Sequence, residues 1–304
     1  MKRQKPSPLD AAARLPQGPP MNETPSSTAP APPASGAHAK SKDKGGWRSL
    51  LLFVLAAWLL RSVIVAPFSI PSGSMLPTMA IGDHLFVHKW PYGISKYSFP
   101  FQFPRFEGRL FAQLPKRGDI VVFRPPGQED VDFVKRVIGL PGDRISVSGG
   151  KVTLNGKPLA RESLGMMAIA VSQNSPCRVV AAATPMTRPT PDGGQDCLYP
   201  AFRETLPGGR SYLTLDQVDT SPGDEFTETK VPAGHVFMMG DNRDDSLDSR
   251  FSPYVGGVGL VPIENLVGRA SRIYWSTDGS AELIKPWTWF SALRGSRIGG
   301  SYDL

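Results

Sequence analysis

The chain has 304 residues, of which 40% are hydrophobic, so it can bury a sizeable core and is not expected to be disordered throughout. Its 31 glycines and 31 prolines, with short runs of Val, Ile, Phe and Tyr between them, favour strands over a helix bundle. The net charge of +7 comes without basic-aromatic interleaving or a helix-turn-helix pattern, which argues against nucleic acid as a partner.

Residues 1–46 are rich in Pro, Ala, Ser and Gly, and we expect a disordered tail that cannot bury a core. Much of the excess positive charge lies before residue 49. Basic residues next to an apolar run mark the cytoplasmic side of a membrane segment. This location indicates a membrane rather than nucleic acid, with the N-terminus in the cytoplasm.

Residues 49–66 form the only run that approaches the roughly 20 apolar residues needed by a membrane-spanning helix. We predict one transmembrane anchor over residues 47–66. Arg61 would cost at least about 2.5–3.5 kcal/mol at mid-bilayer, but near the end of the helix its side chain can snorkel outward. A cleavable signal peptide and a buried core helix are the alternatives, although Pro67 disfavours cleavage directly after the run.

A turn with the sequence Ser-Gly-Ser-Met-Leu-Pro-Thr follows the anchor at residues 72–78. Gly73 and the neighbouring prolines allow a sharply bent backbone that exposes Ser74 as a nucleophile. By itself, such a sequence is far more often an ordinary turn.

Activation of a serine needs a base, and none of the four histidines stands out as one. His84 and His88 share one predicted strand, but no carboxylate or cysteine completes a metal site, so a metalloenzyme is disfavoured and no cofactor is expected. Lys135 lies in an apolar strand-like run, where burial would favour its neutral form. A solvated lysine at a strand edge is the simpler alternative.

A polar loop rich in aspartates occupies residues 240–250 after an apolar run. Its acids could bind calcium, but Arg243 and Arg250 are interleaved with them, and internal ion pairs are therefore the stronger expectation.

Together, three segments resemble the type I signal peptidase family. They are the serine turn at residues 72–78, Lys-Arg-Val-Ile-Gly-Leu-Pro-Gly-Asp at 135–143, and Gly-Asp-Asn-Arg-Asp-Asp-Ser-Leu-Asp-Ser-Arg at 240–250. The resemblance implies a serine peptidase that removes signal peptides from preproteins after small residues. It implies that Ser74 is the nucleophile and Lys135 its base, that Ser72 and the Ser74 amide form the oxyanion hole, and that Ser246 orients the lysine.

The resemblance also assigns supporting roles. Ion pairs between Asp241 and Arg136 and between Asp248 and Arg250 would hold the polar loop against the lysine strand. The substrate pocket would be lined by apolar side chains, namely Phe68, Ile70, Met79, Phe133 and Val134.

Strand-like runs at 84–88, 119–123, 132–138, 144–148, 152–154, 235–239 and 266–275 predict a mostly β, antiparallel fold of linked sheets. We expect a discontinuous catalytic core at 67–150 and 231–280, a smaller inserted domain at 151–230, and an amphipathic or flexible segment at 281–304. The two cysteines, Cys177 and Cys197, lie on a domain that is expected outside the cytoplasm, where disulfides form. They could form a disulfide or remain free thiols.

Substrates held in the bilayer would require an active site at its surface, so the lipid bilayer is the second expected partner. Aromatic residues at 99–111 and 287–290 could contact it or pack on the core. The expected location is the inner membrane, with the catalytic domain outside the cytoplasm. The alternatives are a pilin-processing or self-cleaving Ser/Lys peptidase and a non-enzymatic anchored scaffold; the oligomeric state is not predicted.

Overall fold

The computed structural model describes residues 44–178, 180, 185–282 and 284–302. The tail predicted for residues 1–46 lies, up to residue 43, outside the described residues. Residues 46–304 form one compact unit whose described part is mostly β, and every pairing between the described strands is antiparallel, as predicted.

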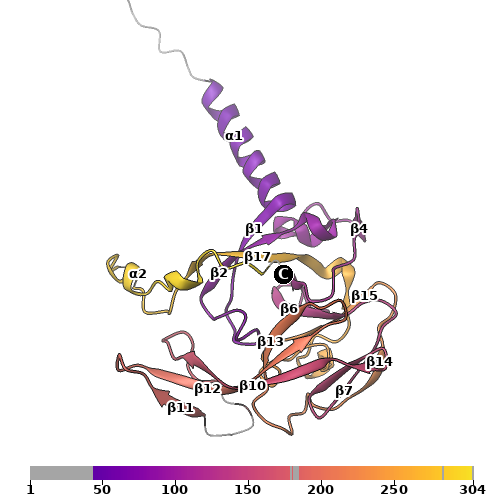
Figure 1. Ribbon diagram of the computed structural model, residues 1–304. Helices are drawn as coiled ribbons and strands as arrows, with labels where there is room; N and C mark the ends of the chain where they lie inside the picture. Colours follow the sequence, from indigo (N-terminus) through magenta and orange to yellow (C-terminus); the bar gives the residue numbers. More distant parts are fainter. Residues whose placement is uncertain (1–43, 179, 181–184, 283, 303–304) are drawn as a thin grey trace, which may run out of the picture. The chain divides into compact units, whose positions relative to one another are not determined.

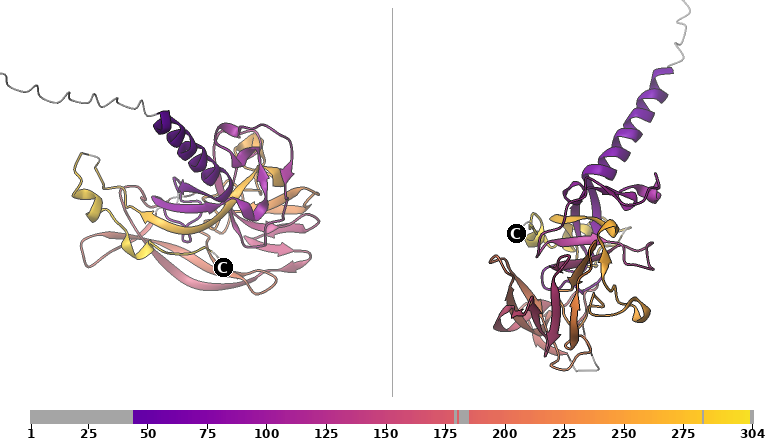
Figure 2. Two further views of the ribbon diagram at one scale, coloured as in Figure 1. Left: turned by 90° about the horizontal axis from the view of Figure 1, so that it is seen from above. Right: turned by 90° about the vertical axis from the view of Figure 1, so that its right-hand side faces the viewer.

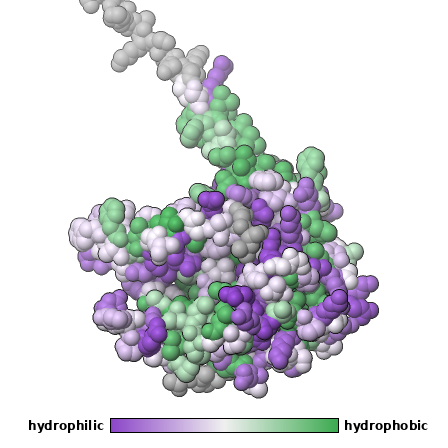
Figure 3. Space-filling view, viewed as in Figure 1, coloured by the Kyte–Doolittle hydropathy of each residue, from purple (hydrophilic) through white to green (hydrophobic). Residues whose placement is uncertain are grey.

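An exposed apolar helix opens the described chain. Helix α1 (Lys44–Leu59) continues into a π-helical turn at Leu60–Ile64. The stretch Gly46–Ile64 is 19 residues long, apolar enough to cross a membrane, and only 6% buried. Figure 1 shows α1 standing clear of the sheets, and Figure 3 shows its hydrophobic surface. This exposure contradicts the alternative of a buried core helix.

The main sheet has seven strands in the order β1-β2-β17-β5-β6-β15-β16. Their bounds are β1 Val65–Ser69, β2 Asp83–His88, β5 Ile120–Phe123, β6 Phe133–Gly139, β15 His235–Met239, β16 Val261–Pro262 and β17 Leu266–Ser276. Strand β1 follows the helical segment directly, so the chain enters the sheet at the end of the proposed anchor (Figure 1).

Three smaller sheets complete the fold of the described residues. The first has the order β10-β12-β11 with β13 paired to β12, the second β14-β7-β8-β9, and the third β3-β4. Their bounds are β3 Ile94–Ser95, β4 Arg109–Leu110, β7 Arg144–Ser148, β8 Lys151–Leu154, β9 Lys157–Pro158, β10 Ala160–Ala170, β11 Met186–Pro189, β12 Gln195–Thr205, β13 Ser211–Leu215 and β14 Phe226–Lys230. Strands β10–β12 lie at the end of the body opposite α1, as Figure 1 and the right-hand view of Figure 2 show.

Strand β5 explains where the core lies. Its four residues are all buried, and alternate side chains of a strand point to opposite faces. Ile120 and Val122 therefore pack in one hydrophobic cluster, while Val121 and Phe123 pack in another. A strand covered on both faces reads as a continuous apolar run, which matches this sequence.

The boundary predicted at residue 150 falls in the tight turn between β7 and β8. Strand β14 of the predicted insertion pairs with β7 of the predicted core, and residues of both parts share one hydrophobic cluster. The insertion is therefore continuous with the core along this sheet.

The C-terminal segment contains the short helix α2 (Thr288–Ser291). After it, Arg297 forms an ion pair with buried Asp83, 2.6 Å apart, and Tyr302 donates its amide to the carbonyl oxygen of Ser271. The end of the described chain is thus fastened to the main sheet, whereas Trp287 and Phe290 are exposed.

Candidate active site

Ser74 lies in the turn that follows β1. Met75, Leu76 and Met79 of this turn are buried in the core, and the Leu76 amide donates to the Gly73 carbonyl oxygen. These anchors fix the turn while the Ser74 hydroxyl lines a cleft. The sharply bent backbone expected around Gly73 is therefore present.

Lys135 comes from the third position of β6, opposite Val121 of β5. Its Nζ lies 2.6 Å from Oγ of Ser74, although 61 residues separate them in the chain. Burial lowers the pKa of Lys135 to about 8, against the opposing effect of Asp248, Asp245 and Asp241, whose negative charges favour the ammonium. The residue is not the solvated strand-edge lysine of the simpler alternative, since it is only 4% exposed.

The polar loop after β15 is fastened to the lysine strand by a buried ion pair. Arg136 donates from Nε and Nη2 to the two carboxylate oxygens of Asp241, each at 2.7 Å. Thr78 of the serine turn also donates to Asp241, at 2.5 Å. One carboxylate thus joins the loop, the strand that carries Lys135 and the turn that carries Ser74.

Asn242 holds the serine turn through its backbone and side chain, a role the sequence analysis missed. Its amide N donates to the Ser74 carbonyl oxygen at 3.0 Å, and its Nδ2 donates to that of Gly73 at 3.1 Å. Asn242 lies in the segment 240–250 that resembles the signal peptidase family, but nothing in the sequence indicates which turn it contacts.

Asp248 and Arg250 form the predicted ion pair, at 2.8 Å, but it does not hold the loop against the lysine strand. Asp248 accepts the amide of Gly240, and Arg250 donates to the carbonyl oxygens of Gly223 and Arg243. The pair therefore ties the loop to itself and to the segment before β14. Burial alone would raise the pKa of Asp248, but the Arg250 charge and the hydrogen bonds lower it overall.

The hydrogen bond predicted from Ser246 to Lys135 is absent. Ser246 is buried and lines the cleft, but its Oγ has no hydrogen-bond partner in the described part of the chain. Lys135 directs its amine to Ser74 instead. Ser72, the predicted second donor of the oxyanion hole, has its Oγ 3.5 Å from that of Ser74.

The cleft beside Ser74 has a volume of about 390 Å³. Of the five predicted pocket residues, Phe68, Phe133 and Val134 line it. Ile70 and Met79 do not, because β1 ends at Ser69 and both side chains turn into the core. Pro71, Val131 and Leu247, which were not predicted, add to the apolar lining.

The insertion reaches the site through a disulfide between Cys177 and Cys197. The next residue, Arg178, forms a bidentate ion pair with Asp245 of the polar loop at 2.6 and 2.8 Å. A Cβ placed on Gly73 would lie 3.3 Å from the Arg178 side chain. The disulfide thus places a cation against both the loop and the serine turn, a contact between distant segments that the sequence does not reveal.

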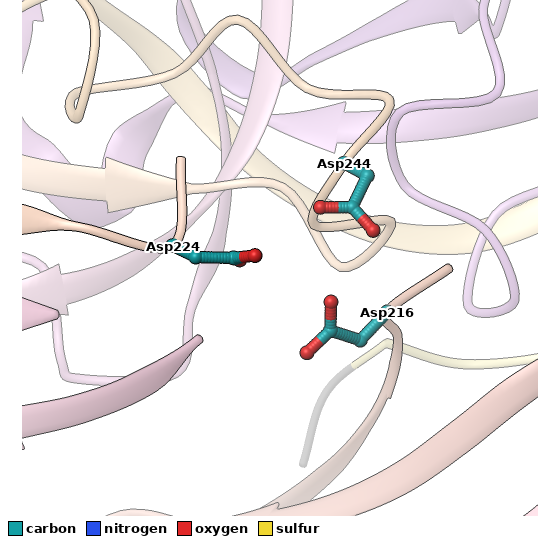
Figure 4. Close-up of side chains that lie close together, drawn as sticks. All are labelled: Asp216, Asp224 and Asp244. Carbon is teal, nitrogen blue, oxygen red and sulfur yellow. The ribbon is translucent and has the colours of Figure 1, made fainter. Parts of the chain in front are cut away.

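Three carboxylates gather at the edge of the cleft, which one of them, Asp244, also lines, and these are the residues to consider for a metal ion. Asp216, Asp224 and Asp244 have oxygens within 4.8 Å of one another and face a common point (Figure 4). Burial raises the pKa of Asp216 to about 6, and the charges of Asp244 and Asp224 add to this effect. Arg161 pairs with Asp216, and backbone amides of residues 217 and 218 bond Asp244, so protein groups already neutralise part of this charge.

None of the described histidines lines the cleft. His84 lies at a tilt against Tyr274, His88 stacks on Trp90, and His235 is hydrogen-bonded to the Ala233 carbonyl oxygen. Among the lysines and histidines in the described part of the chain, Lys135 is the one that lines the cleft with Ser74.

Comparison with known proteins identifies the family of the chain. A family model described as signal peptidase, peptidase S26, matches residues 46–275. The chain belongs to this family. The signal peptidase I of Rickettsia akari is 37% identical over 242 residues, covering 77% of this chain and 80% of that protein. That of Rickettsia typhi is 36% identical over 274 residues, covering 84% of this chain and 92% of that protein.

Membership of this family makes the chain a peptidase, which contradicts the non-enzymatic scaffold alternative. A crystal structure of a signal peptidase I from Enterococcus faecalis V583 also matches, at 21% identity with a TM-score of 0.27, covering 52% of this chain and 97% of that one.

Proposed function

We propose that the chain is a membrane-anchored signal peptidase in which Ser74 and Lys135 form the catalytic dyad. The observation that carries the proposal is the 2.6 Å separation between Nζ of a buried lysine and Oγ of a serine in an apolar cleft. A lysine whose pKa is lowered to about 8 is neutral in about a tenth of the molecules at pH 7, far more than at its ordinary pKa of 10.5.

In the proposed reaction, neutral Lys135 accepts the Ser74 proton as Oγ attacks the carbonyl carbon before the scissile bond. The resulting ammonium then donates a proton to the leaving amine, and a water molecule hydrolyses the acyl-enzyme with Lys135 again as base. The amide of Ser74 and the hydroxyl of Ser72 would stabilise the oxyanion, a contribution of about 3–4 kcal/mol for each effective donor.

Substrate choice would follow from the cleft. Phe68, Phe133 and Val134 present apolar walls beside Ser74, which suit the small residues that precede a signal-peptide cleavage site. The substrates proposed are therefore preproteins with a small-x-small pattern.

The topology forms part of the proposal. Helix α1 would cross the inner membrane with the basic N-terminal residues in the cytoplasm and the sheets outside it. Because Ser74 follows the helix by ten residues after Ile64, the cleft would lie near the bilayer surface, where a membrane-held signal peptide can reach it.

The proposal is tested by cleavage of a preprotein by full-length protein and its Ser74→Ala and Lys135→Ala variants. Each variant should lose at least about 10³-fold in kcat. Matched controls are Ser148→Ala and Lys151→Ala, which change exposed residues of the β7–β8 hairpin and should remain active. Circular dichroism would establish that all variants fold. An active dyad variant would refute the mechanism.

A substrate series separates the two Ser/Lys alternatives. Replacing the small residues of the cleavage site with bulky ones should abolish cleavage by a signal peptidase, while a pilin-type enzyme would tolerate a different pattern. Incubation of the purified protein alone, followed by mass spectrometry, tests for self-cleavage.

A further inference from the structure

A second cavity lies where the proposed anchor meets the main sheet. It has a volume of about 100 Å³ and is lined by three basic side chains, Arg61, Lys89 and Arg124. Asp132 is the one acidic residue among the described lining residues, so the wall carries a formal excess of positive charge. The function proposed above leaves this cavity without a role.

The bonding capacity of these cations is largely unused by the protein. Lys89 is only 6% exposed, and its amine bonds the carbonyl oxygen of Ser98. Arg124 pairs through Nε with Asp132 at 3.0 Å, and among the described residues its terminal nitrogens donate no hydrogen bond. Arg61 forms neither a hydrogen bond nor an ion pair with any described residue.

The cost of this arrangement is visible at Lys89. Burial lowers its pKa to about 8, the positive charges of Arg61 and Arg124 lower it further, and Asp132 acts in the opposite direction. A buried cation without a full counter-charge destabilises a protein, and the acidic side chain that the lining offers to Lys89, Asp132, is already paired with Arg124. The cavity therefore has the electrostatic character of an anion site.

Phosphate is the anion that this donor set fits best. Two guanidinium groups and one ammonium group offer forked and single donors to the oxygens of a phosphodiester. We infer that the cavity binds the phosphodiester of an anionic phospholipid headgroup.

The position of Arg61 favours a lipid over free phosphate. Arg61 lies in the π-helical turn that ends the apolar segment, which is where headgroups would lie if α1 crosses the bilayer as proposed. Leu59, Leu60 and Ile64 around it are exposed and apolar, as needed for contact with acyl chains. Trp58 of α1 stacks on Phe99, another lining residue, so the rim of the cavity is aromatic as well.

The lipid site adjoins the catalytic cleft. Phe68 and Asp132 line both cavities, and Asp132 directly precedes β6, three residues before Lys135. A phosphodiester that pairs with Arg124 competes with Asp132 for that guanidinium and thereby alters the cleft wall. Anionic lipid is therefore expected to change the rate of cleavage as well as to bind.

Full-length protein in nanodiscs of phosphatidylcholine, with or without phosphatidylglycerol, provides the test. Native mass spectrometry counts retained lipids, and cleavage of a soluble peptide substrate reports kcat/KM. Lys89→Gln and Arg124→Gln should each bind phosphatidylglycerol about tenfold more weakly and lose its effect on kcat/KM. The matched control, Arg105→Gln, removes an exposed arginine outside the cavity and should behave as wild type.

Two results would overturn the inference. One is unchanged phosphatidylglycerol retention and rate response in both cavity variants. The other is an equal response to inorganic phosphate in discs of phosphatidylcholine alone, which would identify free phosphate as the ligand. Two further measurements separate failure of the lipid site from failure of the proposed peptidase mechanism. Lipid retention by Ser74→Ala reports binding without cleavage, and cleavage by the wild type in discs of phosphatidylcholine alone reports the peptidase without anionic lipid.

Discussion

Gly240 lies so close to Ser74 that a Cβ on it would be 2.6 Å from the Ser74 carbonyl oxygen. The same Cβ would clash with Oγ and Cβ of Ser246. A side chain of any size at position 240 would therefore push the polar loop away from the serine turn. Glycine is required here by close approach rather than by an unusual backbone angle, since its φ lies outside the left-handed region.

We expect Gly240→Ala to lower kcat by about 10²-fold, because a displacement of about 1 Å at a catalytic group can have this effect. The measurement is preprotein cleavage, with circular dichroism as a check of folding. Gly295→Ala is the control, since a Cβ there meets no atom within 4 Å. If the two variants cleave equally fast, the close approach has no catalytic importance.

The pH–rate profile should report the ionisation of Lys135. In the proposed dyad only the neutral amine can accept the Ser74 proton, and burial lowers the pKa of Lys135 to about 8. The rate is therefore expected to rise with pH and to reach half its plateau near pH 8. Stopped assays of kcat/KM across the alkaline range check this, and a rate that falls through the same range would contradict a lysine base.

The same shift should appear in stability. The unfolded chain has Lys135 at its ordinary pKa of 10.5, so between about pH 8 and 10.5 the unfolded state binds more protons than the folded state. Stability contributed by this group therefore rises with pH through that window. Lys135→Met should be more stable than wild type at pH 7, by about 3 kcal/mol at most, and the difference should vanish above pH 10.5. Urea unfolding at several pH values measures it.

Breaking the buried pair of Arg136 and Asp241 should be costly. Asp241→Asn leaves a buried guanidinium without its counter-charge, and a loss of about 3–5 kcal/mol in unfolding free energy is expected. Arg144→Met removes one partner of an exposed pair with Glu228 and should change the stability by less than about 1 kcal/mol. If the two variants lose similar amounts of unfolding free energy, burial of the pair of Arg136 and Asp241 contributes little to stability.

The disulfide should affect both stability and catalysis. Cys177 and Cys197 are 20 residues apart, and a loop of this size is worth about 3 kcal/mol. In the Cys177→Ser/Cys197→Ser variant, Arg178 is also no longer fixed beside Asp245, so cleavage should slow several-fold even where the protein stays folded. Arg178→Gln separates the effects, since it should slow cleavage while leaving the disulfide intact. Unchanged cleavage in both variants would show that the insertion does not contribute to catalysis.

The fold was largely predictable because its strands are short apolar runs between Gly and Pro residues. The seven strand-like runs fall on β2, β5, β6, β7, β8, β15 and β17, each within a residue of its observed bounds. The predicted insertion was harder to interpret, because β14 pairs with β7 across about 80 residues of sequence that carry no signal for the pairing.

The candidate site was predictable only in part. Lys135 and Arg136 could be placed on opposite faces of one strand by alternation, and both are buried as that environment requires. The missing bond of Ser246, the inward turn of Ile70 and the contacts of Asn242 and Arg178 depend on how distant loops pack. The sequence around these residues does not predict that packing.

The hydrogen bond from Asn242 to Gly73 joins residues 169 positions apart, and Arg297 reaches back 214 positions to Asp83. During synthesis, Ser74 therefore leaves the ribosome long before the residues that hold its turn in place have been made. Contacts of such separation form late, because a long loop must close before they are made. A nascent or truncated copy would be inert, and proteolytic activity would begin only once the whole body has folded.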